Sequence, residues 1–193
     1  MTVRCTHIGR RLAPLALALA AAWTCMCPDA YAQTADAPAL KAAFVYNFAK
    51  FTEWPADTLP PGAQLVLCVA GDAEVGRALD QAASGRKIDG HPLAIWQGRP
   101  DLAVGGCHVL YIGRVDNPQA GALLDAVKGQ PVLTVGDLPT FTRIGGAVQL
   151  FVENGRMRFA IHVEATQRAR LRLSSRLLNL AKLVQDETSA PPR

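Results

Sequence analysis

The chain has 193 residues, a length that predicts one domain and a possible processed segment. Half of the residues are hydrophobic and 19% are charged, which is ordinary globular composition with enough apolar material for a core. The formal net charge is +4, but the first 32 residues hold three arginines and one aspartate, so the remainder carries +2. This small excess gives no argument for a nucleic-acid partner.

The N-terminus has the three parts of a secretory signal peptide. Arg4, Arg10 and Arg11 precede the apolar run LAPLALALAAAWT, and the small residues of the sequence AYA end at Ala32. An uncleaved membrane anchor is the alternative, but this run of thirteen residues is short for a span of about 20. We therefore predict cleavage after Ala32, a soluble exported product without membrane insertion, and a single domain of residues 33–193.

Residues 40–55 (LKAAFVYNFAKFTEWP) predict a helix that stops at Pro55. The residues on its most aromatic side are Leu40, Phe44, Phe51 and Trp54, and Asn47 lies among them. A buried amide needs hydrogen-bond partners, so we expect Asn47 to act as a structural clamp to a neighbouring backbone segment. Alternatively, this face is a contact surface for another protein, with Asn47 at its polar centre.

The middle of the chain alternates strands with helical stretches. Continuous apolar runs predict buried parallel strands at 64–72, 91–96, 107–113 and 130–137. Helices are expected at 73–83, with Asp72 as N-cap, and at 117–129, with Pro118 near the first turn. The alternation predicts an α/β fold in three layers, with a mainly parallel sheet and helices on both faces.

The last third of the chain has a different pattern. Two alternating runs within 147–163 flank Asn154-Gly155, a strong signal for an antiparallel hairpin at one edge of the sheet. Residues 164–169 predict a short helical turn. Residues 174–184 predict a helix capped by Ser174 or Ser175, whose inward side chains are Leu177, Leu178, Ala181 and Val184.

Two cysteines, Cys68 and Cys107, remain after removal of the signal peptide, an even pair in an oxidising compartment. A disulfide needs Cα atoms about 4.4–6.8 Å apart, and neighbouring strands are about 4.8 Å apart. A bond between them would make the first and third strands neighbours, as in the flavodoxin-like order 2-1-3-4. The bond would be a structural staple or a redox-responsive link; two free thiols are the remaining alternative.

The sequence contains no convincing catalytic or metal-binding motif. His91, His108 and His162 lack the spacing of zinc ligands, and neither a nucleophile elbow nor a phosphate-binding loop occurs. We therefore predict that the protein is not an enzyme and needs no cofactor or metal.

Two sets of residues are candidates for binding. Gly71-Asp72 and Gly136-Asp137 each follow a strand, at the end where α/β sheets bind ligands, although both aspartates are also explained as N-caps. A basic face is formed by Arg168, Arg170, Arg172 and Arg176. Such a run is often simply solvated, but guanidinium groups suit partners that carry carboxylates.

The chain resembles the YfiR family of small periplasmic proteins over nearly all of residues 38–185. The resemblance rests on LKAAFVYNFAKFTEWP, LVLCVAGD, CHVLYIG and the stretch from FTRIGG to RLSSRLLNLAKLV. It implies a repressor that binds the periplasmic domain of an inner-membrane diguanylate cyclase and limits cyclic-di-GMP synthesis and biofilm formation. It also implies a homodimer, sequestration by an outer-membrane lipoprotein, and redox sensitivity through cysteines.

Cys68 and Cys107 match one cysteine pair of that family, whereas residues 147–163 lack the second pair. The competing function is a periplasmic sensor or carrier of a small ligand, bound in the crevice near Gly71-Asp72 and Gly136-Asp137.

Overall fold

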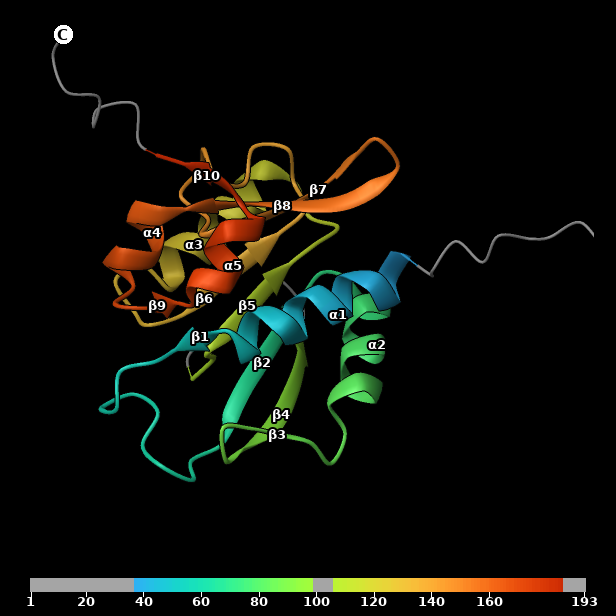
Figure 1. The fold of residues 1–193 in the computed structure, drawn as a ribbon. Helices are drawn as coiled ribbons and strands as arrows, with labels where there is room; N and C mark the ends of the chain where they lie inside the picture. Colours follow the sequence, from blue (N-terminus) through green and yellow to red (C-terminus); the bar gives the residue numbers. More distant parts are fainter. Residues whose placement is uncertain (1–36, 99–105, 186–193) are drawn as a thin grey trace, which may run out of the picture. The chain divides into compact units, whose positions relative to one another are not determined.

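A computed structural model describes residues 37–98 and 106–185 (Figure 1). These residues all belong to one unit, Ala35–Arg193. The predicted signal peptide, residues 1–32, lies outside the described residues, so its cleavage after Ala32 stays a prediction.

A central sheet of eight strands organises the domain, and the expected mixed α/β fold with a mostly parallel sheet is confirmed. Its spatial order is β10-β8-β7-β6-β5-β2-β4-β3. The strands are β2 (Leu65–Ala70), β3 (Lys87–Ile88), β4 (His91–Gly98), β5 (Val109–Ile112), β6 (Leu133–Gly136), β7 (Val148–Glu153), β8 (Arg156–His162) and β10 (Lys182–Val184). Strands β4, β2, β5, β6 and β7 run parallel to their neighbours in this series, and β7 pairs antiparallel with β8.

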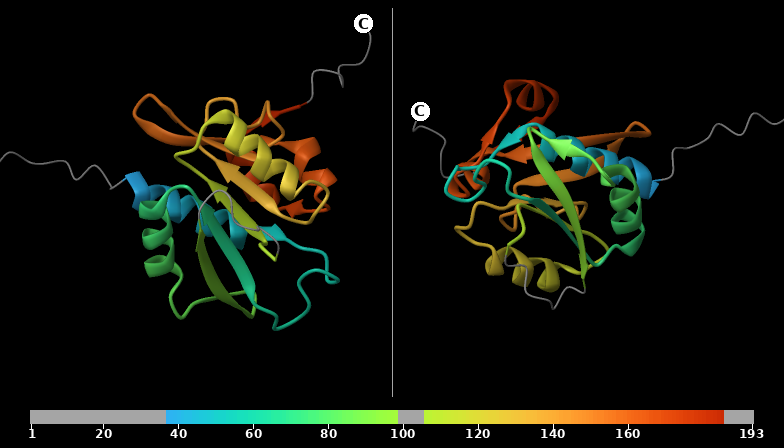
Figure 2. Two further views of the ribbon diagram at one scale, coloured as in Figure 1. Left: turned by 180° about the vertical axis from the view of Figure 1, so that it is seen from behind. Right: turned by 90° about the horizontal axis from the view of Figure 1, so that it is seen from below.

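Helices lie on both faces of this sheet. On one face α1 (Ala37–Lys50), α2 (Ala73–Ala83), α4 (Val163–Arg168) and α5 (Ser175–Leu180) pack onto the inward residues of the strands, such as Leu67 and Val69. On the other face α3 (Asn117–Ala126) packs onto Leu110 and Ile112. Figure 2 shows the sheet between α1 and α3. Both faces of the strands are thus buried, which explains their continuous apolar sequences.

The chain from 174 to 184 corrects one prediction. Ser174 caps α5, accepting a hydrogen bond from the backbone N–H of Leu177, but this helix ends at Leu180. Residues 182–184 then form β10, which pairs in parallel with Ala160–His162 of β8. Residues 182–184 are extended despite their helical pattern, because the open edge of β8 offers hydrogen-bond partners to the backbone of an extended segment.

A small second sheet was not predicted. It pairs β1 (Thr52–Glu53) antiparallel with β9 (Arg172–Leu173). This pairing joins the segment that follows α1 to the segment between α4 and α5.

The prediction that Asn47 is a buried clamp is wrong. Helix α1 ends at Lys50, and its buried residues are Ala42, Val45, Phe48 and Ala49. Asn47 is exposed, and its Nδ2 donates to the carbonyl of Ala43 one turn earlier, at 2.8 Å. The buried face of α1 therefore includes the aromatic ring of Phe48, whereas Phe44 is only partly buried. Phe51 and Trp54 lie beyond the end of the helix and are also only partly buried.

Cys68 and Cys107 form a disulfide, with Cα atoms 5.8 Å apart. Cys68 lies in β2, and Cys107 precedes β5, the parallel neighbour of β2. Both side chains are buried in the α3 side of the core. The bond therefore joins two adjacent central strands whose connection includes α2 and β4.

The imidazole of His108 also joins these strands. Its Nδ1 accepts from the backbone N–H of Val66 at 3.1 Å, an arrangement that requires an unprotonated Nδ1. The indole Nε1 of Trp54 donates to the carbonyl of His108 at 3.2 Å. Burial lowers the pKa of His108 below its ordinary value of 6.5.

Removal of the disulfide is expected to destabilise the domain. In the chain-entropy model the double variant Cys68→Ala/Cys107→Ala loses about 4 kcal/mol of unfolding free energy, measured by urea denaturation. A non-reducing digest of the wild type should contain the Cys68 and Cys107 peptides as one linked species. Recovery of Cys68 and Cys107 as free thiols after purification under oxidising conditions would contradict the structural disulfide.

Stability should depend on the protonation of His108. Because its pKa is lower in the folded state, the unfolded chain binds the extra proton, and the free energy of unfolding falls as the pH drops through 6.5. His108→Asn keeps an acceptor near Nδ1 and does not titrate. Urea unfolding at pH 7.5 and pH 5.5 should show a smaller loss for this variant than for wild type; equal losses would exclude His108 as the cause.

Candidate functional site

The carboxyl ends of β2, β5 and β6 lie side by side at the place where the sequence predicted a ligand crevice. Helices α2 and α3, which follow β2 and β5, lie on opposite faces, so the chain diverges at this edge. Gly71 ends β2 with φ of +86°, and a Cβ there would lie 2.2 Å from the carbonyl oxygen of Gly113. Only glycine permits this approach, which brings the residues after β2 and β5 together.

Asp72 is a buried acid at these strand ends, with 1% of its surface exposed. Its Oδ1 accepts from the backbone N–H groups of Glu74 and Val75, so the predicted N-cap of α2 is observed. Its Oδ2 lies 3.3 Å from Nε of Arg114, which also contacts the carboxylate of Glu74. Chiefly because of Asp72, the pKa of Arg114 is raised, and the ion pair offsets the burial of the aspartate.

Asp137 has a different role from Asp72. No helix follows it among the described residues up to Ala147, so the N-cap explanation is wrong for this aspartate. Its Oδ2 accepts from the hydroxyl of Tyr111 at 3.2 Å and from Nζ of Lys41 at 2.5 Å. Asp137 therefore links α1 to the ends of β5 and β6.

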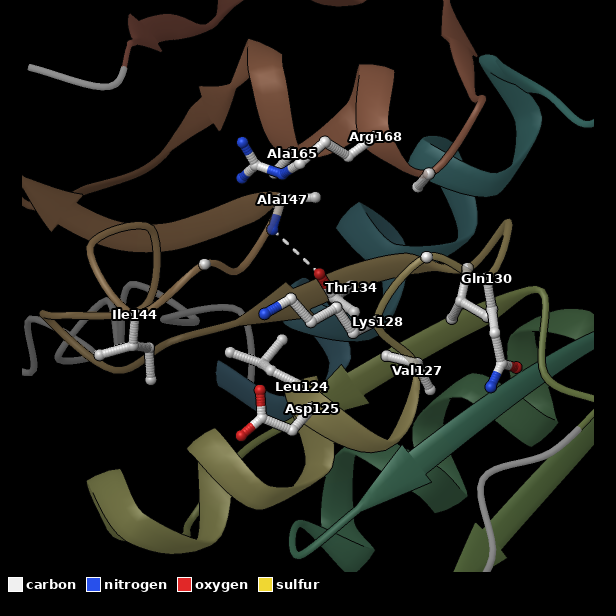
Figure 3. Close-up of a pocket in the computed structure, with 14 residues that line it drawn as sticks. Leu124, Asp125, Val127, Lys128, Gln130, Thr134, Ile144, Ala147, Ala165 and Arg168 are labelled. Atoms are coloured by element: carbon white, nitrogen blue, oxygen red, sulfur yellow. Dashed lines mark hydrogen bonds between the residues drawn. The ribbon is translucent and has the colours of Figure 1, made fainter. Parts of the chain in front are cut away.

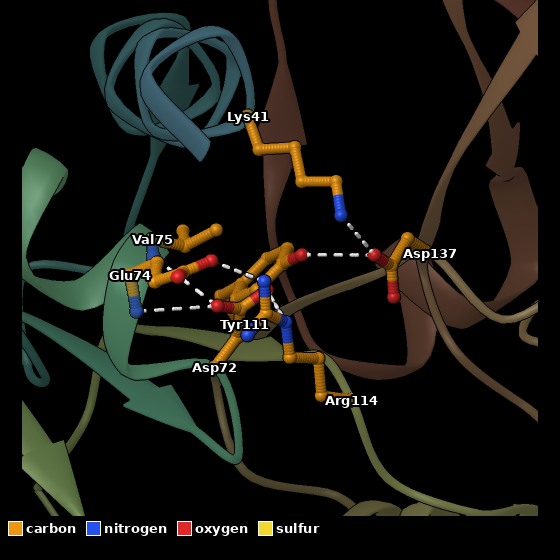
Figure 4. Close-up of polar contacts among 7 residues, drawn as sticks. All are labelled: Lys41, Asp72, Glu74, Val75, Tyr111, Arg114 and Asp137. Atoms are coloured by element: carbon orange, nitrogen blue, oxygen red, sulfur yellow. Dashed lines mark hydrogen bonds and ion pairs between the residues drawn. The ribbon is translucent and has the colours of Figure 1, made fainter. Parts of the chain in front are cut away.

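Tyr111 is the centre of this arrangement (Figure 4). Its side chain is fully buried, and burial, followed by the negative charges of Asp137 and Asp72, raises the pKa of the phenol. The hydroxyl therefore stays protonated and donates to Asp137. Two cations, Lys41 and Arg114, balance the acids on either side of it.

The four predicted crevice residues thus lie at one edge of the sheet, but the protein's own side chains occupy it. Gly136 is covered as well, since a Cβ there would lie 2.5 Å from the ring of Phe141. A ligand at this edge would have to displace Lys41 or Arg114 from its ion pair. We call this arrangement of Lys41, Asp72, Glu74, Tyr111, Arg114 and Asp137 the polar lock, because it connects α1, α2 and the strand ends.

The structure places the four predicted arginines on the surface. Arg170 lies 3.1 Å from Asp57 and Arg172 lies 3.8 Å from Glu53, so two of them pair with the segment after α1. Arg168 is on α4 and Arg176 on α5. All four are exposed, with the apolar side chains of Leu180 and Leu183 exposed by 72% and 52% further along the chain.

Lys41, Tyr111 and Arg114 were not anticipated as members of this site. Arg114 follows the third strand just as Asp72 follows the first, so the rule that parallel strand ends meet was enough to find it. Lys41 is 96 residues from Asp137, and no local pattern reports such a contact.

Within residues 37–98 and 106–185 no group of three or more histidine, cysteine or acidic side chains is arranged to hold a metal ion. The helices of the same residues include none with the length and apolarity that crossing a bilayer requires.

The Lys41–Asp137 contact should contribute to stability. Both side chains are about one-fifth exposed (20% and 23%), so solvent screens the pair only partly. A double-mutant cycle with Lys41→Met and Asp137→Asn should give a coupling of about 1 kcal/mol in unfolding free energy. The exposed Lys50, changed to Met with Asp137→Asn, is the control pair. Equal coupling in both cycles would show that the contact has no energetic role.

Comparison with known families adds an independent finding. A family model described as YfiR/HmsC-like matches residues 38–182, from the second residue of α1 to the first residue of β10. The matched region contains the sheet core, the disulfide, the polar lock and all four exposed arginines. This family is periplasmic and regulatory rather than catalytic. The chain belongs to the YfiR/HmsC-like family.

Proposed function

We propose that this protein is a periplasmic repressor that binds the periplasmic domain of an inner-membrane diguanylate cyclase and holds the cyclase inactive. The observation that carries the proposal is the family match over residues 38–182, which covers almost the whole described domain. The signal-like segment before Ala32 supports the compartment.

Repression by contact requires different affinity for two states of the cyclase. The protein binds the inactive state more tightly and shifts the population toward it. A shift from 1:99 to 99:1 needs about 5.5 kcal/mol of differential binding. An interface of ordinary size with a few well-packed side chains can supply this difference, so no chemical step is needed.

The contact surface in this proposal is the C-terminal surface, defined as Arg168, Arg170, Arg172, Arg176, Leu180 and Leu183. Its arginines suit carboxylates of a partner, and its two leucines are among the most exposed large apolar side chains described. Protein interfaces are commonly enriched in arginine and contain an apolar core. The partner surface is therefore expected to be acidic around an apolar patch.

The proposal has three further parts. The repressor acts as a homodimer, an outer-membrane lipoprotein can sequester it, and release of the cyclase then raises biofilm formation. The Cys68–Cys107 bond is assigned a structural role, because its sulfur atoms lie in a buried part of the core.

Loss of the protein should raise cellular cyclic-di-GMP. We expect deletion of the gene to increase cyclic-di-GMP and biofilm, and the wild-type gene to restore both. Arg176→Glu/Leu180→Asp, which reverses a charge and removes an apolar contact, should fail to restore repression at normal periplasmic protein levels. Arg156→Glu, an exposed change on the β7–β8 hairpin, should restore it. An unchanged cyclic-di-GMP level after deletion would refute the repressor function.

A further inference from the structure

The outer edge of strand β4 lacks a full-length neighbour among the described residues. On its inner side β4 pairs with β2 without interruption over residues 93–98. On its outer side β3 pairs with β4 only at His91 and Pro92. Within residues 37–98 and 106–185, the stretch 93–98 is therefore an open edge of the eight-stranded sheet, next to the short β3 (Figure 1).

One hydrogen bond shows which backbone groups point to this edge. The N–H of Leu93 donates outward, to the carbonyl of Arg86 at 3.4 Å. Successive residues of a strand direct their N–H and C=O groups to opposite sides. Ile95 and Gln97 therefore also point outward, whereas the residues between them point to β2. In the described part of the chain no strand pairs with the outward groups of Ile95 and Gln97.

The sequence of this edge lacks the usual protection against strand pairing. Edge strands are normally short, or they carry charges, prolines or bulges. Residues 93–98 (LAIWQG) contain no charged residue and no proline, and they pair with β2 in one continuous register. The opposite edge of the sheet is different, because β10 is three residues long and begins with Lys182. An unprotected edge of this length indicates that another strand covers it.

The exposure of β4 also indicates a missing neighbour. Every residue of the central strands β5 and β6 is buried, whereas no residue of β4 is. The side chain of Trp96 is 55% exposed. Tryptophan carries a large apolar surface and is among the side chains that most often anchor interfaces. Ala94, two residues earlier, lies on the same face of the strand and is half-buried.

From this geometry we propose that β4 pairs with β4 of a second copy of the chain, antiparallel across a two-fold axis at Ile95. The inference rests on the homodimer of the proposed function and specifies its contact surface. With the axis at Ile95, this residue exchanges both backbone hydrogen bonds with its copy. The N–H of Gln97 donates to the carbonyl of Leu93 of the second copy. The outward groups are thus paired on both chains at once.

The side chains of this edge fit a second copy of themselves. In the same register Trp96 lies opposite Ala94 of the second copy, at a non-hydrogen-bonded position where side chains approach most closely. The two-fold axis repeats this contact of a large side chain with a small one. Because residues 93–98 are uncharged, the two edges bring no like charges together. A partner that relies on ion pairs would find none at this edge.

A cavity of about 660 Å³ beside Thr134 is a separate feature of the domain (Figure 3). The residues that line it come from α3, α4, β6 and the segments next to them, and none belongs to β4. Lys128 lies at this cavity and is exposed. A charge reversal at Lys128 therefore serves as a control for surface changes away from the β4 edge.

Amide hydrogen exchange on the purified exported protein tests the register without any cyclase. Mass spectrometry with residue resolution at about 1 µM and about 200 µM brackets a micromolar dissociation constant. The amides of Ile95 and Gln97 should exchange at least about tenfold more slowly at the higher concentration, because only the second copy pairs them. The amides of Ala94 and Trp96 face β2 and should be equally protected at both concentrations. Light scattering gives the mass of the species present.

Two variants of Gln97 form a matched pair. Both lose the side chain that lies against α2, where a Cβ on Gly76 would be 2.6 Å from Oε1 of Gln97. Only Gln97→Pro also removes the outward N–H, and it leaves the pairing with β2 intact. Gln97→Pro should weaken the dimer at least about tenfold. Gln97→Ala and Lys128→Glu should dimerise as wild type does, and thermal unfolding shows whether each variant is folded.

The outcomes separate the interface from the homodimer and from repression. A dimer in which Ile95 and Gln97 exchange at the same rate at both concentrations would overturn the β4 interface alone. So would a folded Gln97→Pro variant that dimerises as tightly as Gln97→Ala. A monomer at about 200 µM would overturn both the interface and the homodimer. Repression is measured by cyclic-di-GMP in the deletion strain, so its failure would be seen independently of these results.

Discussion

The position of β2 between two parallel neighbours determines most of this structure. Its backbone pairs with β4 on one side and β5 on the other, and both of its faces are covered by apolar packing. A strand in this position has to be apolar throughout, which is why the run LVLCVA lacks alternation. Because α2 and α3 leave β2 and β5 toward opposite faces, the polar residues after these strands meet at one edge. Asp72, Arg114 and Asp137 are held there by topology.

The parts of the fold that could be predicted from sequence are those with local causes. The apolar runs, the Asp72 cap and the hairpin turn at Asn154-Gly155 each depend on residues close together in the chain. The segment 174–184 could not be predicted locally, because a helical pattern became a strand only through the open edge of β8. The side of α1 that is buried was misjudged for a related reason. Burial was assigned to the side of Leu40, Phe44, Phe51 and Trp54, but α1 ends at Lys50 and its packing against the rest of the domain buries Ala42, Val45, Phe48 and Ala49.

The candidate site shows the same division. Asp72 and Asp137 could be placed at the carboxyl ends of strands from the alternation of strands and helices. A bond between Cys68 and Cys107 was one of the alternatives, and the consequence expected of it, that their strands are neighbours, is observed. The side chains that bind the two aspartates could not be predicted in this way. Asp137 is bound by a lysine from the first helix, and this converts a possible ligand crevice into a lock that fastens α1. The cavity beside Thr134 had no sequence signal, because the residues that line it come from several separate segments of the chain.

The domain has a closely packed interior, and the C-terminal surface is the part proposed for contact with the cyclase. Helix α4 connects the two, because its Ala165 is buried in the core while Arg168 belongs to the C-terminal surface. The chain then runs through β9 to α5, which carries Arg176 and Leu180.

The account depends most directly on contact between this protein and the periplasmic domain of a membrane cyclase. Isothermal titration of the two purified proteins measures that contact. The account predicts a saturable complex with a dissociation constant in the micromolar range or below, weakened at least about tenfold, or 1.4 kcal/mol, by Arg176→Glu/Leu180→Asp. Absence of association at about 100 µM, a free energy weaker than roughly −5.5 kcal/mol, would contradict it.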